Sequence, residues 1–215
     1  EIIDQGRQND LYMYKALLEM YIECGKIEDA WFLFTKSHIQ DVVSWSMMIN
    51  GFKRHGHISQ AIILFQKMFL NGFEPDKLTL ICILKSCTDI GTLDCGRLIH
   101  AYIVKKRLER DKFIGTTLIN MYTKCGSILD ACKVFHGLED PNVVAWSSMI
   151  LGYAEHGHAE KAIQLFKQMR KHRIQPNEIT FLCFLKACSH TFNLKEGKEL
   201  HITITKLGIH LDVLI

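Results

Sequence analysis

The sequence carries few of the usual marks of disorder, membrane insertion or catalysis. Its 215 residues include only three prolines and no low-complexity segment, which argues against a disordered linker. Its apolar runs, such as residues 78–84, are far too short to span a bilayer. There is no C-x-x-C pair, no glycine-rich phosphate loop and no nucleophile elbow. The formal net charge of +3 neither demands nor excludes a nucleic-acid partner.

Two histidine pairs suggest a metal at first sight. They are His55-x-His57 and His156-x-His158, and the second pair continues as H-x-E. A zinc deaminase also needs P-C-x-x-C, because two thiolates complete its zinc site, and no proline here precedes a cysteine. We therefore expect no metal, no cofactor and no catalytic residue.

The eight cysteines are placed like apolar core residues rather than like a disulfide framework. They fall on apolar helical stripes, so we expect small buried side chains in a reducing compartment. Three of them recur at a fixed distance: Cys24, Cys82 and Cys87 return as Cys125, Cys183 and Cys188.

A long internal repeat decides the expected architecture. The segment from Val42 to Ser46 returns from Val143 to Ser147, an offset of 101 residues. Each 101-residue unit divides into three similar pieces. The predicted pieces are 11–41, 42–76 and 77–111, then 112–142, 143–177 and 178–212, with 1–10 as the tail of an earlier piece and 213–215 as the start of a further one.

Each piece has the pattern of two short helices. In 42–76, apolar residues follow an i, i+3, i+4, i+7 spacing from Trp45 and again from Ala61, and Gly56 separates the two stripes. One helix pair cannot bury its apolar face alone, so neighbouring pairs must stack. We predict an all-α fold, a right-handed α-solenoid (superhelix) of about twelve short antiparallel helices. Four alanines at equivalent places in the second helices should permit close packing: Ala30, Ala61, Ala131 and Ala162.

The pieces resemble pentatricopeptide repeats. The two central pieces are similar to the family consensus along their length, down to Pro75-Asp76 and Pro176-Asn177. The 31-residue pieces, with Met20-Tyr21 and Cys24-Gly25 in the first, resemble its short (S) motif. The third pieces, with Leu84-Lys85, Gly96 and His100, resemble its long (L) motif, so that 1–10 would be the tail of an L repeat. This S, P, L order is typical of the PLS subfamily of land plants.

The resemblance implies RNA binding by helix-turn-helix repeats. Single-stranded RNA is expected in the groove of the superhelix, at about one base per repeat, read by the fifth and the last residue together. The family also implies a plant mitochondrion or chloroplast, RNA editing or other RNA processing, and editing cofactor proteins as further partners. The pairs are Lys15/Asp41, Ser46/Asp76, Ile81/Asp111, Thr116/Asn142, Ser147/Asn177 and Leu182/Asp212.

The side-chain chemistry of these pairs predicts particular bases. An ionised aspartate only accepts hydrogen bonds, so it suits guanine N1–H or uracil N3–H, whereas an asparagine amide can donate to adenine or cytosine. In the family, a hydroxyl at the fifth position favours purines. We predict G for Ser46/Asp76, and A for the two pairs in which a hydroxyl meets asparagine. The other three pairs have fifth residues of non-coding types and should discriminate weakly.

The second residue of each piece is apolar, and its role stays open at this stage. Such a side chain can sandwich a base, or it can begin the buried face of the first helix. The polar last residues can likewise read bases or merely cap helices. The predicted base-sandwiching residues are Val43, Leu78, Phe113, Val144 and Ile179.

Two other classes of function also stay open. A tetratricopeptide-like solenoid would grip a peptide in the same groove, although the W-x2-L-G-x2-Y pattern is absent. A deaminase-like enzyme would need a C-terminal extension, and we expect that extension and any targeting segment to lie outside this sequence.

Overall fold

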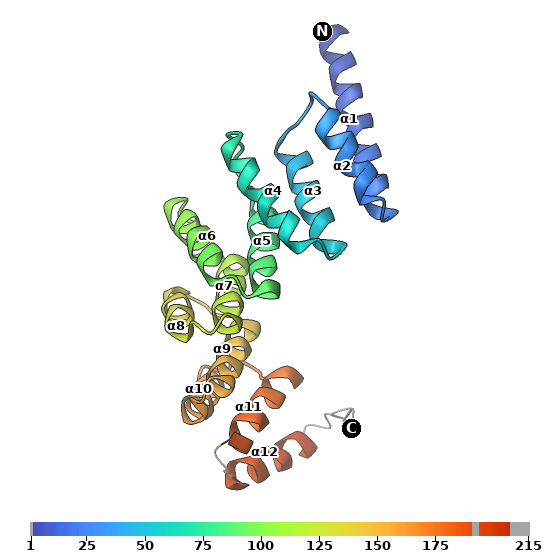
Figure 1. The fold of residues 1–215 in the computed structure, drawn as a ribbon. Helices are drawn as coiled ribbons and strands as arrows, with labels where there is room; N and C mark the ends of the chain where they lie inside the picture. Colours follow the sequence, from blue (N-terminus) through green and yellow to red (C-terminus); the bar gives the residue numbers. More distant parts are fainter. Residues whose placement is uncertain (1, 191–193, 207–215) are drawn as a thin grey trace. The chain divides into compact units, whose positions relative to one another are not determined.

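The described part of the chain, residues 2–190 and 194–206 of a computed structural model, consists of twelve α-helices and no strand (Figure 1). The predicted all-α solenoid class is confirmed. The helices are α1 (Ile2–Glu23), α2 (Ile27–Lys36), α3 (Val42–Arg54), α4 (Ile58–Leu70), α5 (Lys77–Ile90), α6 (Leu93–Lys105), α7 (Lys112–Lys124), α8 (Ile128–Gly137), α9 (Val143–Glu155), α10 (Ala159–Lys171), α11 (Glu178–His190) and α12 (Leu194–Lys206). None of them combines the length and apolar character needed to cross a membrane.

The helices form two compact units, α1 to α5 and α6 to α12. In the first unit, α3 packs against α1, against its own partner α4 and against α5. In the second unit, α9 packs in the same way against α7, α10 and α11. The first helices of successive pairs therefore form a row within each unit: α1, α3 and α5 in one, and α7, α9 and α11 in the other (Figure 1).

The 101-residue repeat is reproduced in the helix bounds. Both ends of α3 and of α4 return 101 residues later as the ends of α9 and α10. The helix α1 differs, because it begins at Ile2 and continues without a break past residue 11, where we placed the start of a piece. No proline and no helix-stop glycine lies at that boundary, so nothing in the local sequence ends the helix there.

The core consists of the predicted apolar stripes. Trp45, Met48 and Ile49 of α3 are at most 4% exposed, and the four predicted alanines are fully buried. All eight cysteines are free thiols. The expectation that the recurring cysteines are buried is confirmed for Cys87, Cys183 and Cys188, whereas Cys82 and Cys125 are half-buried. It is wrong for Cys24, which is exposed because it lies in the turn after α1 rather than on its apolar stripe.

Close helix approach depends on glycine at a few positions. A Cβ added to Gly152 of α9 would lie 2.6 Å from Thr123 Cγ2 and 2.9 Å from Thr123 Cβ. The equivalent residue 101 positions earlier is Gly51 of α3, and a Cβ added to it would lie 3.1 Å from Ile22 Cγ1. These glycines allow α9 to pack directly on α7, and α3 on α1.

We predict that Gly152→Ala destabilises the fold by about 1–2 kcal/mol. Overpacking costs about 1–3 kcal/mol, and the better helix propensity of alanine offsets up to about 1 kcal/mol of this. Urea unfolding followed by circular dichroism measures the change. Gly137→Ala in α8 is the matched control, because its added Cβ meets nothing within 4 Å, and this variant should be as stable as the parent or more so. Equal stability of Gly152→Ala and the parent would contradict the close packing of α9.

Candidate nucleic-acid interface

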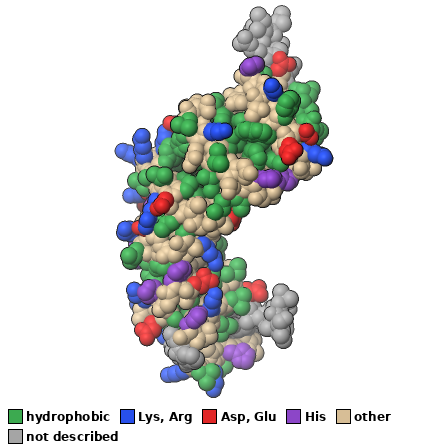
Figure 2. Space-filling view, viewed as in Figure 1, with side chains coloured by type: hydrophobic (Ala, Val, Ile, Leu, Met, Phe, Trp, Pro, Cys, Tyr) green, Lys and Arg blue, Asp and Glu red, His purple; other side chains and the backbone are tan. Residues whose placement is uncertain are grey.

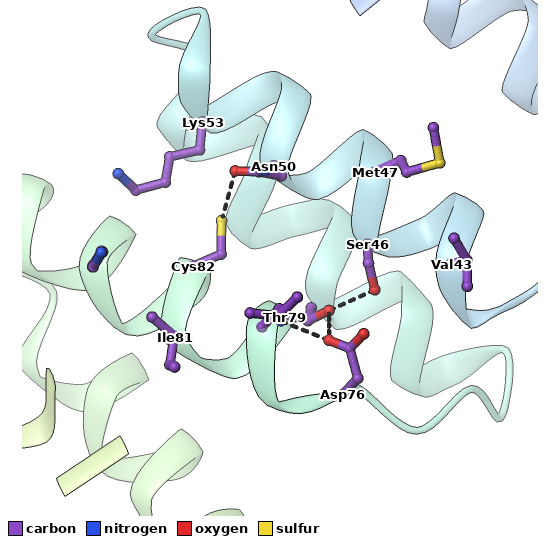
Figure 3. Close-up of a pocket in the computed structure, with 11 residues that line it drawn as sticks. Val43, Ser46, Met47, Asn50, Lys53, Asp76, Thr79, Ile81 and Cys82 are labelled. Atoms are coloured by element: carbon purple, nitrogen blue, oxygen red, sulfur yellow. Dashed lines mark hydrogen bonds between the residues drawn. The ribbon is translucent and has the colours of Figure 1, made fainter. Parts of the chain in front are cut away.

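A hollow of about 460 Å³ lies between α3 and α5, on the row of first helices (Figure 3). Among its lining residues are five that the sequence singled out. Two are the coding pair Ser46 and Asp76, two are the second residues Val43 and Leu78, and one is Ile81. The structure thus brings one predicted base-reading pair and the two flanking apolar side chains together at one place.

The same hollow contains residues that the sequence argument missed. They follow one face of each helix at helical spacing, from Val43 through Ser46 and Asn50 on α3 and from Leu78 along α5. A second stripe, opposite to the buried one, was the signal that could have identified them. The additional lining residues are Met47, Asn50, Lys53, Thr79, Cys82 and Lys85.

The second residues of the pieces point into solvent instead of into the core. The five predicted ones are between 47% and 74% exposed, and Figure 2 shows apolar side chains at the surface. The buried apolar stripe of each first helix begins further along, for example at Trp45 and Leu80. The interpretation that these residues begin the buried face is therefore wrong. Tyr12, the second residue of 11–41, is 76% exposed and belongs to the same set, although we did not predict it.

The last residues of the first five pieces cap the helices that follow them. In each case a side-chain oxygen accepts a hydrogen bond from a backbone N–H in the first turn of the next helix. The bond fixes the position of the predicted base-reading side chain relative to the start of the next first helix. The bonds are Asp41 to Ser44 N at 2.9 Å, Asp76 to Thr79 N at 2.8 Å, Asp111 to Phe113 N at 3.0 Å and to Ile114 N at 3.1 Å, Asn142 to Ala145 N at 2.9 Å, and Asn177 to Thr180 N at 2.9 Å.

Capping uses one terminal atom of the side chain and leaves the other. The cap involves Oδ1 in Asp76, Asn142 and Asn177, and no hydrogen bond within the described residues uses Oδ2 of Asp76 or Nδ2 of either asparagine. A backbone N–H can only donate, so the asparagine atom that faces it must be the oxygen. The cap therefore fixes the amide orientation and directs the NH₂ group away from the helix end.

Lys15 and Asp41 form an ion pair with each other. Lys15 Nζ lies 2.6 Å from Asp41 Oδ2, while the other carboxylate oxygen caps α3. Burial alone would raise the pKa of Asp41, but the hydrogen bonds from Lys15 and Ser44 lower that pKa below its usual value. Both oxygens are engaged, so this pair offers a base no free carboxylate oxygen.

The fifth-position hydroxyls are turned inward. Ser46 Oγ donates to Val42 O at 2.8 Å, and Ser147 Oγ donates to Val143 O at 2.8 Å. Thr116 Oγ1 makes the same bond to Lys112 O at 2.6 Å, and it also lies 3.4 Å from Asn142 Oδ1. Ser147 is only 5% exposed. These hydroxyls therefore present lone pairs, not protons, to the groove.

Two predicted pairs are not contained within one described unit. Ile81 and Asp111 belong to different units, each described by itself. Leu182 is 52% exposed on α11, but Asp212 lies outside the described residues.

Lysines along the first helices are paired with carboxylates of neighbouring first helices. In the hollow, Lys53 lies 3.2 Å from Asp89. In the second unit, Glu155 of α9 binds Lys186 of α11 at 2.8 Å and Lys124 of α7 at 3.5 Å. The hydrogen bond from Lys186 lowers the pKa of Glu155 against the burial that raises it. The chain thus neutralises part of its own basic surface.

The two histidine pairs lie at turns and contact the backbone. His55 Nε2 is 2.7 Å from Ile22 O, and His156 Nδ1 is 2.8 Å from Gly152 O. Within the described residues, no group of three or more His, Cys, Asp or Glu side chains could hold a metal ion.

Comparisons with family models and with known proteins find pentatricopeptide repeats along the chain. A model described as the PPR repeat family matches residues 40–89 and 141–190, and one described as a PPR repeat matches residues 116–140. A chloroplastic pentatricopeptide repeat-containing protein of Arabidopsis thaliana is 39% identical over 207 residues, which cover 95% of this chain and 28% of that protein. A second chloroplastic relative from the same plant is 37% identical over 206 residues, which cover 96% of this chain and 33% of the relative. The chain thus spans about a third or less of the length of these relatives.

Solved structures share the fold. The crystal structure of the pentatricopeptide repeat protein PPR10 from maize has a TM-score of 0.68 at 20% identity, covering 91% of this chain and 29% of PPR10. The structure of PPR10 in complex with an 18-nt psaJ RNA element has a TM-score of 0.73 at 17% identity, covering 94% of this chain and 31% of PPR10.

The capping geometry makes a prediction about stability. Asp76→Ala removes the oxygen that caps α5 and should cost about 1 kcal/mol of unfolding free energy, as loss of a helix cap usually does. Asp76→Asn keeps Oδ1 and should stay within about 0.5 kcal/mol of the parent. Urea unfolding of both variants provides the measurement. If the two variants lose the same amount, the cap does not contribute as described.

Proposed function

Because this chain belongs to the pentatricopeptide repeat family, we propose that its rows of first helices bind single-stranded RNA at about one base per repeat. The observation that carries the proposal is the hollow between α3 and α5. It places two exposed apolar side chains, Val43 and Leu78, beside a serine and a carboxylate that can read the edge of a base. Stacking between the apolar side chains holds any base, whereas the polar pair selects one.

The pair Ser46/Asp76 is proposed to read guanine. Oδ2 of Asp76 accepts a hydrogen bond, which suits the ring N–H of guanine or of uracil. The proton of Ser46 is used internally, so its oxygen can only accept from a base. Guanine carries an amino group next to its ring N–H, whereas uracil carries a carbonyl oxygen on each side. An accepting serine therefore favours guanine over uracil.

The pairs Thr116/Asn142 and Ser147/Asn177 are proposed to read adenine. Their capped amides direct Nδ2 away from the helix end, where it can donate to adenine N1. Cytosine also offers a ring-nitrogen acceptor, and the choice of the purine follows from the family preference for a hydroxyl at the fifth position. The remaining pairs are proposed to contribute affinity with little selectivity.

We propose further that the chain acts in a plant organelle, a mitochondrion or a chloroplast, as the recognition part of an editing or other RNA-processing factor. The chloroplastic names of two relatives support the compartment. The S, P, L order of the predicted pieces supports the PLS subfamily, whose editing members act with cofactor proteins.

We predict that binding to single-stranded RNA weakens as salt increases, because lysines displace counterions from phosphates. Glu155→Gln should strengthen binding at low salt and steepen the salt dependence by about one to two phosphate contacts, since it releases Lys124 and Lys186. Fluorescence anisotropy at several salt concentrations measures both quantities.

Glu160→Gln is the control for this prediction. It removes the same charge from α10, a second helix that carries no predicted base-reading residue, so affinity and salt dependence should stay close to those of the parent. Equal affinity for an RNA duplex, or binding that ignores salt, would contradict the proposed mode of binding.

We predict that one side chain moves the base preference. Asn177→Asp keeps the capping oxygen but replaces the donating amide by an acceptor, so the preferred base should shift from adenine towards guanine by about tenfold in relative affinity, by analogy with base contacts in DNA readout. Binding to RNAs that differ at a single position measures the shift, and circular dichroism checks the fold.

Asn142→Asp is the matched variant. It should shift the preference in the same way at the neighbouring base. If both variants fold and bind RNA with unchanged base preferences, Asn142 and Asn177 are helix caps only.

A further inference from the structure

A third side chain joins each of two coding pairs, and it comes from the next helix. Thr79 Oγ1 lies 2.5 Å from Ser46 Oγ and donates to Asp76 Oδ1 at 2.7 Å (Figure 3). Thr79 is the third residue of 77–111, and it is 2% exposed. The fifth residue of one piece and its last residue are thus linked by a buried hydroxyl that belongs to neither position.

The same arrangement occurs independently in the second unit. Thr180 Oγ1 lies 2.7 Å from Ser147 Oγ and donates to Asn177 Oδ1 at 2.7 Å. Thr180 is fully buried, and it also accepts a hydrogen bond from the backbone N–H of Asn177 at 3.2 Å. The same chain of hydrogen bonds thus occurs twice, once with an aspartate and once with an asparagine as the last residue of the piece, which indicates that it is a recurring feature of the fold.

The hydroxyl protons in each chain are all used internally. The threonine proton is donated to Oδ1, and the serine proton is shared between the backbone carbonyl and the threonine oxygen. Oδ1 then accepts from both the threonine N–H and the threonine hydroxyl, which occupies both of its lone pairs. Only Oδ2 of Asp76, or Nδ2 of Asn177, remains for a base.

We propose that Thr79 and Thr180 are positioning residues that set base selectivity. Each threonine holds the capping side chain by a second bond, so that the side chain presents one defined atom to the base. Each threonine oxygen also accepts the serine proton, which leaves the serine oxygen to act as an acceptor. Selectivity in these repeats then depends on three residues, the third of which lies on the following helix. This inference depends on the proposed RNA-binding function and deepens it.

The remaining hydroxyl–asparagine pair lacks this side chain. Ala145 stands where Thr180 stands in the later piece, so Asn142 Oδ1 accepts the Ala145 N–H and has only a long 3.4 Å contact with Thr116 Oγ1. The proposal therefore ranks the two adenine-reading pairs, with Ser147/Asn177 more selective than Thr116/Asn142.

The test uses the full chain and single-stranded RNA oligomers that differ only at one base. The base opposite Asn177 is first located as the position whose preference moves in Asn177→Asp. Thr180→Val, which replaces the hydroxyl by a methyl group of similar size, should then lower the affinity ratio of adenine over the next-best base by about two- to tenfold, the effect of one hydrogen bond. The salt dependence of binding should not change, because no phosphate contact is altered.

Three further variants complete the test. Thr180→Ser keeps the hydroxyl and should keep the selectivity. Thr117→Val of α7 is the matched control, because its hydroxyl binds only the backbone oxygen of Phe113, at 2.8 Å, and selectivity should be unchanged. Thr79→Val repeats the loss at the guanine-reading pair in the other unit, where the ratio of guanine over uracil should fall.

The outcomes separate this inference from the proposed function. If Asn177→Asp moves the base preference while folded Thr180→Val and Thr79→Val keep the parental selectivity, the positioning role is overturned and RNA reading stands. If the parent chain does not bind single-stranded RNA, or Asn177→Asp moves nothing, the proposed function fails and this inference with it. Should the valine variants fail to fold, Ala145→Thr decides, since an added hydroxyl should sharpen the adenine preference at Asn142, and unchanged selectivity overturns the proposal.

Discussion

The unpaired backbone N–H groups at the start of each first helix are the constraint on which the interface depends. A helix leaves its first N–H groups without partners inside the helix, and here the last residue of the preceding piece satisfies one of them. That bond ties the end of one repeat to the beginning of the next. It also places the side chain at the edge of the groove, beside the exposed second residue of the same helix. In the proposed mode of RNA binding, one side chain therefore serves both structure and recognition.

This double role limits which residues can occupy the position. Serine and threonine are good helix caps, but each has a single oxygen, and capping leaves no second polar atom for a ligand. Aspartate and asparagine have two terminal atoms, so one can cap the helix while the other reads a base. The capping bond also makes the asparagine amide unambiguous, because its oxygen must face the N–H. Toward a ligand, Asp76 and Asn177 then differ in a single atom: Oδ2 of Asp76 accepts a hydrogen bond, whereas Nδ2 of Asn177 donates one.

In the proposed mode of RNA binding, the groove combines weak general attraction with a few selective positions. Exposed apolar side chains and lysines can bind any single strand. Ion pairs with carboxylates on neighbouring first helices neutralise part of the positive charge of the lysines. Glu155, between Lys124 and Lys186, is the clearest case. The pair Lys15/Asp41 is likewise neutralised within the chain, at a coding position, because the ion pair satisfies both side chains without a base. The proposed mode of binding therefore assigns affinity and selectivity to different residues along the same row of helices.

The sequence by itself determined the helix pairs, their 101-residue recurrence and the buried stripes, because helical periodicity and glycine stops are local properties. It also identified Ser46 and Asp76 as one pair, through a resemblance in spacing. It left open whether Val43 is buried and whether Asp76 caps the next helix, because the spacing alone does not decide either point. It gave no sign of Thr79, whose hydroxyl reaches the coding pair only when α5 packs beside α3. Those points depend on which atoms of different helices come within hydrogen-bonding distance, and only the tertiary structure decided them.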